Sequence, residues 1–103
     1  MLIHNVFFWL NDSVTPADRK AFEGELAALM KTPTVVGGHW GVPAAIPPRP
    51  VVDASYDYAC SVIFKTIEDH AAYQTTDAIH KAFIANSKQW WKQVKIYDME
   101  ISG

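Results

Sequence analysis

No segment limits the folds open to this chain more than residues 2–10. They read LIHNVFFWL, contain no Gly or Pro, and are rich in aromatic and branched side chains, so they predict a β-strand. Successive side chains of a strand point to opposite faces. Both faces are apolar here, with Leu2, Val6, Phe8 and Leu10 on one face and Ile3, Phe7 and Trp9 on the other. A strand of this kind is normally covered on both sides.

The short length of the chain limits how both faces of this strand can be covered. The chain has 103 residues, of which 50% are hydrophobic and 19% charged, so we expect one folded domain over residues 1–103 and no long disordered tract. A chain this short buries only roughly 60–70% of the surface that it exposes when unfolded. Association with a second copy would therefore add usefully to a modest core.

Charge and composition disfavour several classes of partner. The net charge is −2 and the nine Lys and Arg form no basic run, whereas nucleic-acid binding needs a concentrated positive face. Cys60 is the only cysteine, which excludes an intrachain disulfide and cysteine-based zinc motifs. No apolar stretch approaches the ~20 residues of a membrane span, and residues 2–10 lack the basic start and the cleavage site of a signal peptide. We therefore expect a cytoplasmic protein that binds neither nucleic acid nor a membrane.

The segment after the first strand predicts a helix with a defined start. Thr15 suits the N-cap, and Asp18 stands where a capping box needs an acidic side chain. Apolar residues then recur at helical spacing between residues 22 and 30, so one stripe of the helix should face the core. A proline soon after Lys31 indicates that the helix ends there.

The rest of the chain alternates strand and helix signals. Residues 35–42 predict a strand that contains three glycines, and these indicate a bulge or a close approach of two backbones. The elements expected after it are a proline-rich loop over 43–57, a strand over 58–64, a helix from Thr66 to about Tyr73, a short helix capped by Asp77, and a last strand over 91–101.

This order of elements, β-α-β-β-α-β, predicts an α+β fold of the ferredoxin-like type. Its four strands form one antiparallel sheet, and its helices cover one face of that sheet. The other face would be left bare, although the first strand is apolar on both sides. A large exposed apolar patch usually marks an interface, so we expect a homodimer that packs sheet face against sheet face.

Three groups of residues resemble a known family. They are Ile3-His4-Asn5-Val6-Phe7-Phe8-Trp9-Leu10 in the first strand, His39-Trp40-Gly41 in the second, and the C-terminal series Ala72-Tyr73, His80-Lys81-Ala82-Phe83, Trp91 and Lys95-Ile96-Tyr97-Asp98. In their order and spacing they resemble the stress-responsive dimeric α/β-barrel family. The resemblance implies a ferredoxin-like protomer, a homodimer that closes into an α/β barrel, and a pocket between sheet and helices in each protomer.

The resemblance also implies candidate site residues. In a cyclase of this family, a histidine and a tyrosine of the pocket promote an intramolecular aldol condensation without metal or cofactor, and a first-strand histidine lies close by. The matching positions are His80, Tyr73 and His4, with Phe83 and Trp91 on pocket-lining positions. The family pattern Tyr-x-x-His-Pro-x-His is altered here, because the His-Pro pair is missing and one residue is added between Tyr73 and His80.

The chemistry of these residue types fits such a reaction. A neutral imidazole can take a proton near pH 7, so His80 could deprotonate a carbon next to a carbonyl while Tyr73 donates to the developing oxyanion. The structural alternatives are a core or helix-capping role for His80 and a packed ring with a wet hydroxyl for Tyr73. His4 shares its face with apolar residues and needs a hydrogen-bond partner there, as a core residue or as a polar group of the pocket.

Other conspicuous residues have structural explanations. His39 suits a sheet edge and His70 a solvated helix start, and the four histidines show no i, i+4 or H-x-H spacing, so no metal site is expected. Adjacent residues of a strand face opposite sides, so Trp90 and Trp91 either divide between dimer interface and pocket or both join the core. Cys60 suits a small buried hydrophobic position.

Three functions follow from the sequence. The first is a protein with a pocket for a small apolar or aromatic molecule that acts, without a cofactor, as a cyclase or isomerase on a carbonyl compound of polyketide type. The second is a non-catalytic stress-responsive or ligand-binding dimer. The third is a cofactor-free monooxygenase of the same architecture.

Overall fold

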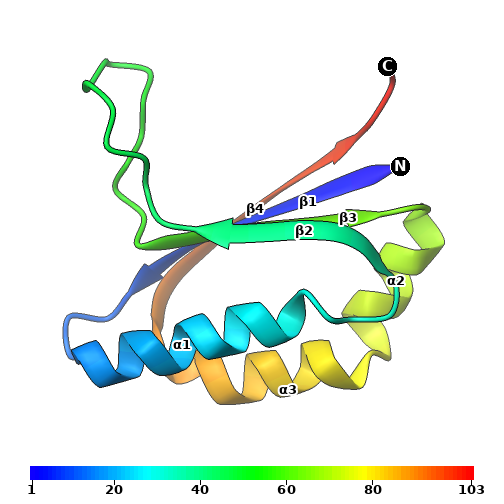
Figure 1. Cartoon of the computed structure of the whole chain (residues 1–103), viewed down its shortest axis with the longest axis horizontal. Coiled ribbons are helices and arrows are strands. Elements are labelled where there is room, and N and C mark those ends of the chain that lie inside the picture. Colours follow the sequence, from blue (N-terminus) through cyan, green and yellow to red (C-terminus); the bar gives the residue numbers. More distant parts are fainter.

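The computed structural model describes residues 1–103 and places every helix on one face of a four-stranded sheet (Figure 1). The elements are β1 (Leu2–Leu10), α1 (Pro16–Leu29), β2 (Val35–Gly41), β3 (Tyr58–Phe64), α2 (Ile67–Thr75), α3 (Ala78–Ser87), a short 3₁₀ helix η1 (Lys88–Trp90) and β4 (Trp91–Glu100). All neighbouring strands are antiparallel, in the order β2-β3-β1-β4. The predicted ferredoxin-like α+β fold is confirmed. None of the helices combines the length and the apolar character that crossing a membrane requires.

Side-chain caps set the starts of the helices, as the sequence predicts. Thr15 and Asp18 form the capping box of α1, with the Thr15 hydroxyl accepting from the Asp18 amide at 3.1 Å. Thr66 caps α2 and Asp77 caps α3 in the same way. The expected end of α1 near Lys31 is close to the observed end at Leu29. Because α2 and α3 are separate helices, the direction of the chain changes between Tyr73 and His80.

The core forms between the inner face of β1 and the helices. Leu2, Val6, Phe8 and Leu10 alternate along β1 and are all buried. The ring of Phe22 from α1 is fully buried and lies 5.2 Å from that of Phe8, centroid to centroid. The odd positions of β1 therefore face away from the helices.

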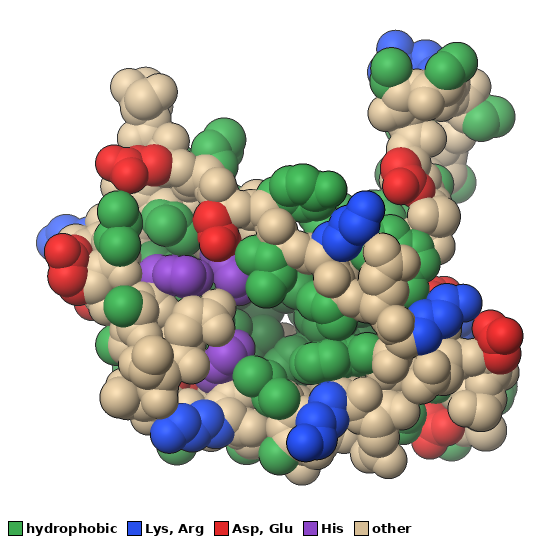
Figure 2. Space-filling view, turned by 180° about the vertical axis from the view of Figure 1, so that it is seen from behind, with side chains coloured by type: hydrophobic (Ala, Val, Ile, Leu, Met, Phe, Trp, Pro, Cys, Tyr) green, Lys and Arg blue, Asp and Glu red, His purple; other side chains and the backbone are tan.

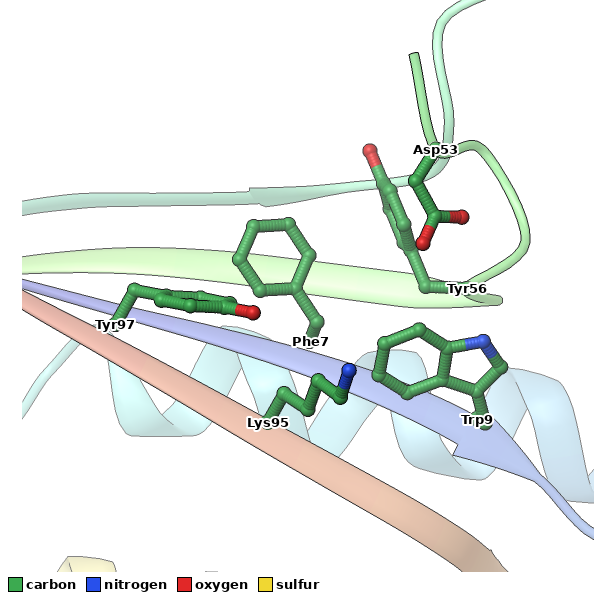
Figure 3. A pocket seen from close by; sticks show the side chains of 6 residues that line it. All are labelled: Phe7, Trp9, Asp53, Tyr56, Lys95 and Tyr97. Carbon is green, nitrogen blue, oxygen red and sulfur yellow. The ribbon is translucent and has the colours of Figure 1, made fainter. Parts of the chain in front are cut away.

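The outer face of the sheet carries no helix. Phe7 and Trp9 of β1 lie there beside Tyr97 of β4, whose side chain is 60% exposed. The loop between β2 and β3 projects on this side of the sheet (Figure 1), and its end brings the Tyr56 ring to 5.1 Å from that of Phe7. Figure 3 shows these side chains around a shallow cavity of about 180 Å³, together with Asp53 and Lys95. Most of the outer face remains open to a partner.

The two adjacent tryptophans both belong to the core side. Trp90 ends η1 and its ring lies 6.0 Å from that of Phe22, whereas Trp91 begins β4 with its ring 5.3 Å from that of Phe8. The alternative in which one of the pair faces the dimer interface is therefore wrong. That alternative requires an extended backbone at both residues, and the 3₁₀ turn that ends at Trp90 is not extended.

Gly38 is the residue of β2 at which the sheet and a helix approach closely, as the glycines of this strand predict. The register of β2 shifts between Val35 and Gly37, and Gly38 then faces the end of α1. A Cβ atom at Gly38 would lie 2.8 Å from Met30 Sδ and 3.0 Å from the carbonyl oxygen of Ser61. The sheet can approach the helix this closely only because no side chain stands there.

Gly38→Ala should therefore lower the free energy of unfolding, by about 1–3 kcal/mol, as is usual when a packed site is overfilled. Gly41→Ala is the matched control in the same strand, because nothing beyond its chain neighbours lies within 4 Å of the added methyl group. Urea unfolding of the two variants and the wild type measures the difference. Equal midpoints for the two variants would contradict the close packing at Gly38.

Candidate functional site

A cavity of about 120 Å³ lies between the inner face of the sheet and the helices. Its wall is mostly hydrophobic, with contributions from β1, β3 and β4 on one side and from α1, α2 and α3 on the other. Figure 2 shows this side of the molecule, where a hollow with green walls has histidine side chains at one end. The predicted site residues His4, Tyr73, His80, Phe83 and Trp91 all line this cavity.

Tyr73 and His80 meet inside the cavity in spite of the altered spacing between them. Tyr73 comes from α2 and His80 from the first turn of α3, and their ring centroids are 4.1 Å apart with a tilt of 37°. The Asp77 carboxylate accepts the backbone N–H of His80 at 2.8 Å and fixes the start of α3. The break between the helices therefore absorbs the added residue.

His4 has the hydrogen-bond partner that its burial requires. It is 2% exposed, and its Nδ1 contacts the carboxylate of Asp98, which stands directly opposite on β4. Its Nε2 lies 3.4 Å from the side-chain nitrogen of Gln74 in α2. Asp98 was not among the predicted site residues. It shares the parity of Val94 and Ile96, which line the cavity, and this pattern could have revealed it.

His70 does not lie in the solvent as the sequence suggested. Its side chain is half-buried, and its ring centroid is 4.8 Å from that of His4 and 5.4 Å from that of Phe64. The first turn of α2 lies against β1 and β3 at this point, which brings His70 over the end of the sheet. His39, by contrast, is exposed on the edge strand β2, away from these groups.

Burial keeps the central groups uncharged near neutral pH. It lowers the pKa of His80, and the nearby His4 acts in the same direction. It also lowers the pKa of His4, although the hydrogen bond and the charge of Asp98 oppose this effect. Burial raises the pKa of the Tyr73 phenol. The cavity therefore combines neutral imidazoles, which can accept a proton, with a protonated phenol, which can donate one.

Cys60 also lines the cavity but cannot act as a thiolate there. Burial raises the pKa of its thiol to about 12, and no cation lies beside it to stabilise the charged form. The predicted role as a small buried residue is confirmed.

Two buried nitrogens of the cavity wall have no hydrogen-bond partner in the protein. They are Nδ1 of His80 and Nε1 of Trp91. Buried polar atoms are nearly always paired, so unpaired ones in a cavity indicate positions where a ligand or an ordered water binds. Trp91 Nε1 can only donate, whereas His80 Nδ1 can donate or accept.

The family model for the stress responsive A/B barrel domain matches residues 2–101, which is nearly the whole chain. The chain belongs to this family. No curated protein matches it. The family resemblance drawn from the sequence is therefore confirmed.

Solved structures agree on the fold of this family member. A dimeric ferredoxin-like protein of unknown function from Thermobifida fusca is 20% identical, with a TM-score of 0.78 over 97% of this chain and 90% of the other. A hydroxynitrile lyase from Passiflora edulis is 12% identical, with a TM-score of 0.79 over 98% and 93% of the two chains. A putative antibiotic biosynthesis monooxygenase from Nitrosomonas europaea is 17% identical, with a TM-score of 0.66 over 97% of each chain. At these identities the likeness shows the fold alone.

The lowered pKa of His80 predicts a loss of stability in mild acid. An unfolded histidine takes up a proton near pH 6.5, whereas His80 in the folded protein resists it until a lower pH. The free energy of unfolding should therefore fall as the pH drops from about 7 through 6.5 towards the folded-state pKa, and the group should contribute no slope above pH 7.5.

Urea unfolding at a series of pH values measures this slope. His80→Gln should reduce it, because glutamine does not titrate and the lowered pKa of His4 then accounts for the slope that is left, whereas His39→Gln at an exposed position should leave it unchanged. The assignment fails if the slope between pH 7.5 and pH 5.5 is the same in the wild type and in His80→Gln.

Proposed function

We propose that this protein is an acid–base enzyme that acts on a small carbonyl compound through its own side chains. The observation that carries the proposal is the pairing of Tyr73 with His80 inside an apolar cavity, with both rings uncharged near pH 7. Few side chains other than histidine can act as a base at that pH, and efficient proton transfer needs a pKa near the working pH.

The proposed reaction is a proton transfer at carbon followed by bond formation within one molecule. The His80 imidazole removes a proton from a carbon next to a carbonyl, and the Tyr73 hydroxyl donates a hydrogen bond to the enolate oxygen. The enolate carbon then attacks a second carbonyl of the same molecule, and a new C–C bond forms. The imidazolium of His80 returns its proton to the resulting alkoxide, so the enzyme ends in its starting state.

His4 and Trp91 would orient the substrate. His4 is held by Asp98 through Nδ1, which leaves Nε2 available for another contact on the side of Gln74. The indole N–H of Trp91 lacks a partner in the protein and could donate to a second oxygen of the substrate. Phe83 adds an aromatic wall, with its ring centroid 5.9 Å from that of Trp91.

The size of the cavity limits the part of the substrate that is enclosed. A volume of about 120 Å³ is close to that of cavities that hold a benzene-sized molecule, about 150 Å³. A ring or a short polyketide-like segment would fit, and any longer tail would extend through the opening. The hydroxynitrile lyase fold relative supports carbonyl chemistry on this architecture, because a hydroxynitrile is the cyanide adduct of a carbonyl compound.

A ligand-binding protein without catalysis is the second candidate. The observation in its favour is the contact between Tyr73 and His80, which face each other through their rings. The tilted ring contact covers part of the imidazole, and a binding protein could use both rings as an apolar wall.

Substitutions of the pair separate the two candidates. With a small aromatic or polyketide-like diketone that quenches tryptophan fluorescence, His80→Gln should lower kcat about 10²–10⁴-fold, the usual effect of losing a general base. Tyr73→Phe should lower kcat about 10²–10³-fold, as for loss of an oxyanion donor. His39→Gln should have no effect.

The outcomes point to different functions. Binding without turnover by the wild type would favour the ligand-binding protein. Turnover that His80→Gln leaves unchanged would remove His80 from the mechanism. Oxygen uptake with a quinol-type substrate would instead indicate a monooxygenase, as the Nitrosomonas europaea fold relative is named.

We also propose a homodimer that buries the outer face of the sheet. Phe7, Trp9 and Tyr97 give this face an apolar surface, and the Thermobifida fusca fold relative is dimeric. The cavity lies on the opposite face, so the dimer would leave it accessible.

A charge on the outer face should therefore break the dimer. Tyr97→Glu places a carboxylate at a position 60% exposed in the protomer, and it should convert the dimer to a monomer in sedimentation equilibrium. Ile67→Glu, at a position 53% exposed on α2, is the matched control and should stay dimeric. A dimeric Tyr97→Glu would place the interface elsewhere.

A further inference from the structure

A second cluster of reactive side chains lies at one end of the cavity. It consists of His4 from β1, His70 from α2 and Asp98 from β4, and one metal-ligating atom of each lies within 4.8 Å of the others. The residues are far apart in sequence, so no spacing motif marks them. Two imidazoles and a carboxylate are the donor set of many divalent-metal sites in proteins.

The two imidazoles present their Nε2 atoms to one common point. The side-chain nitrogen of Gln74 lies 3.4 Å from Nε2 of His4 and 3.4 Å from Nε2 of His70. Gln74 is an exposed residue of α2, and its side chain lies between the two imidazoles. Rotation of its amide would replace the nitrogen by the carbonyl oxygen, which is a metal ligand.

Asp98 stands where a metal site needs a supporting carboxylate. It contacts Nδ1 of His4, the nitrogen opposite the one that faces Gln74. A metal-ligating histidine almost always donates its other N–H to a carboxylate, a carbonyl or water, which fixes the ring and its tautomer. His4 is 2% exposed and cannot turn freely, so its Nε2 is already oriented.

We propose that His4 and His70 bind one divalent metal ion of the Zn²⁺ class through their Nε2 atoms. Asp98 holds His4 in position, the Gln74 carbonyl oxygen supplies a third ligand, and a fourth position stays open. Zn–N bonds of about 2.0–2.1 Å would place the two nitrogens about 3.3 Å apart in a tetrahedral site.

The open coordination position of the ion would be available to a molecule in the cavity. His4 and Gln74 are both part of the cavity wall, so an ion bound to them lies at its rim. There it could bind a carbonyl or carboxylate oxygen of an enclosed molecule as a Lewis acid. The site uses neither Tyr73 nor His80 and can be measured without a substrate, so its failure and the failure of their acid–base role are distinguishable. It does use Nε2 of His4, so with the ion bound the substrate oxygen would contact the ion in place of that nitrogen.

Calorimetric titration of tag-free protein with Zn²⁺ tests the site directly. The wild type should bind one ion per protomer. His70→Ala should weaken binding at least tenfold, and Asp98→Asn should weaken it about 10–100-fold, the usual range for loss of a supporting partner. His39→Ala and His80→Gln should bind as the wild type does.

Cobalt provides a second measurement that reports geometry. Co²⁺ should give the visible bands of a tetrahedral ion in the wild type, and Zn²⁺ should displace them. His70→Ala should lack those bands while retaining the circular dichroism and tryptophan emission of the folded protein. The proposal is overturned by the absence of saturable binding, by equal affinity in His70→Ala, or by loss of binding in His39→Ala.

Discussion

The position of β1 in the middle of the sheet is the constraint on which the other features depend. β1 is hydrogen-bonded to β3 on one edge and to β4 on the other, so its register fixes which residues of three strands share a face. A shift of one residue would exchange its two sets of side chains. The buried set of β1 supplies the core and part of the cavity wall, and the other set supplies the outer face.

The same register creates the polar end of the cavity. Pairing of His4 with Asp98 across β1 and β4 places an imidazole in an apolar interior together with its hydrogen-bond partner. Burying that imidazole alone would cost free energy, because its two ring nitrogens would lose their hydrogen bonds to water without replacement. The helices add the other groups at this end, since the first turn of α2 carries His70 and the Asp77 cap fixes the place of His80.

Much of the fold could be predicted from the sequence because its signals are local. The alternation in β1, the Thr15 capping box and the Asp77 cap each depend on residues close together in the chain, and all are observed. The family resemblance identified five residues that do line one cavity. The position of His70 and the pairing of Asp98 could not be found in this way, because each depends on contacts between distant segments. η1 was missed because three residues of 3₁₀ helix leave no periodic pattern.

The alternation of side chains along β1 places the cavity and the outer face of the sheet on opposite sides of one strand. Even-numbered residues such as His4 and Phe8 face the helices, so changes there act on the core and the cavity. Odd-numbered residues such as Phe7 and Trp9 face outwards, so changes there act on the surface proposed for dimerisation. Because neighbouring side chains of a strand point to opposite faces, the cavity and the outer face can vary independently within one nine-residue segment. The proposed partner on the outer face would let a chain of 103 residues keep a cavity in its small core, because it would add buried apolar surface without filling the cavity.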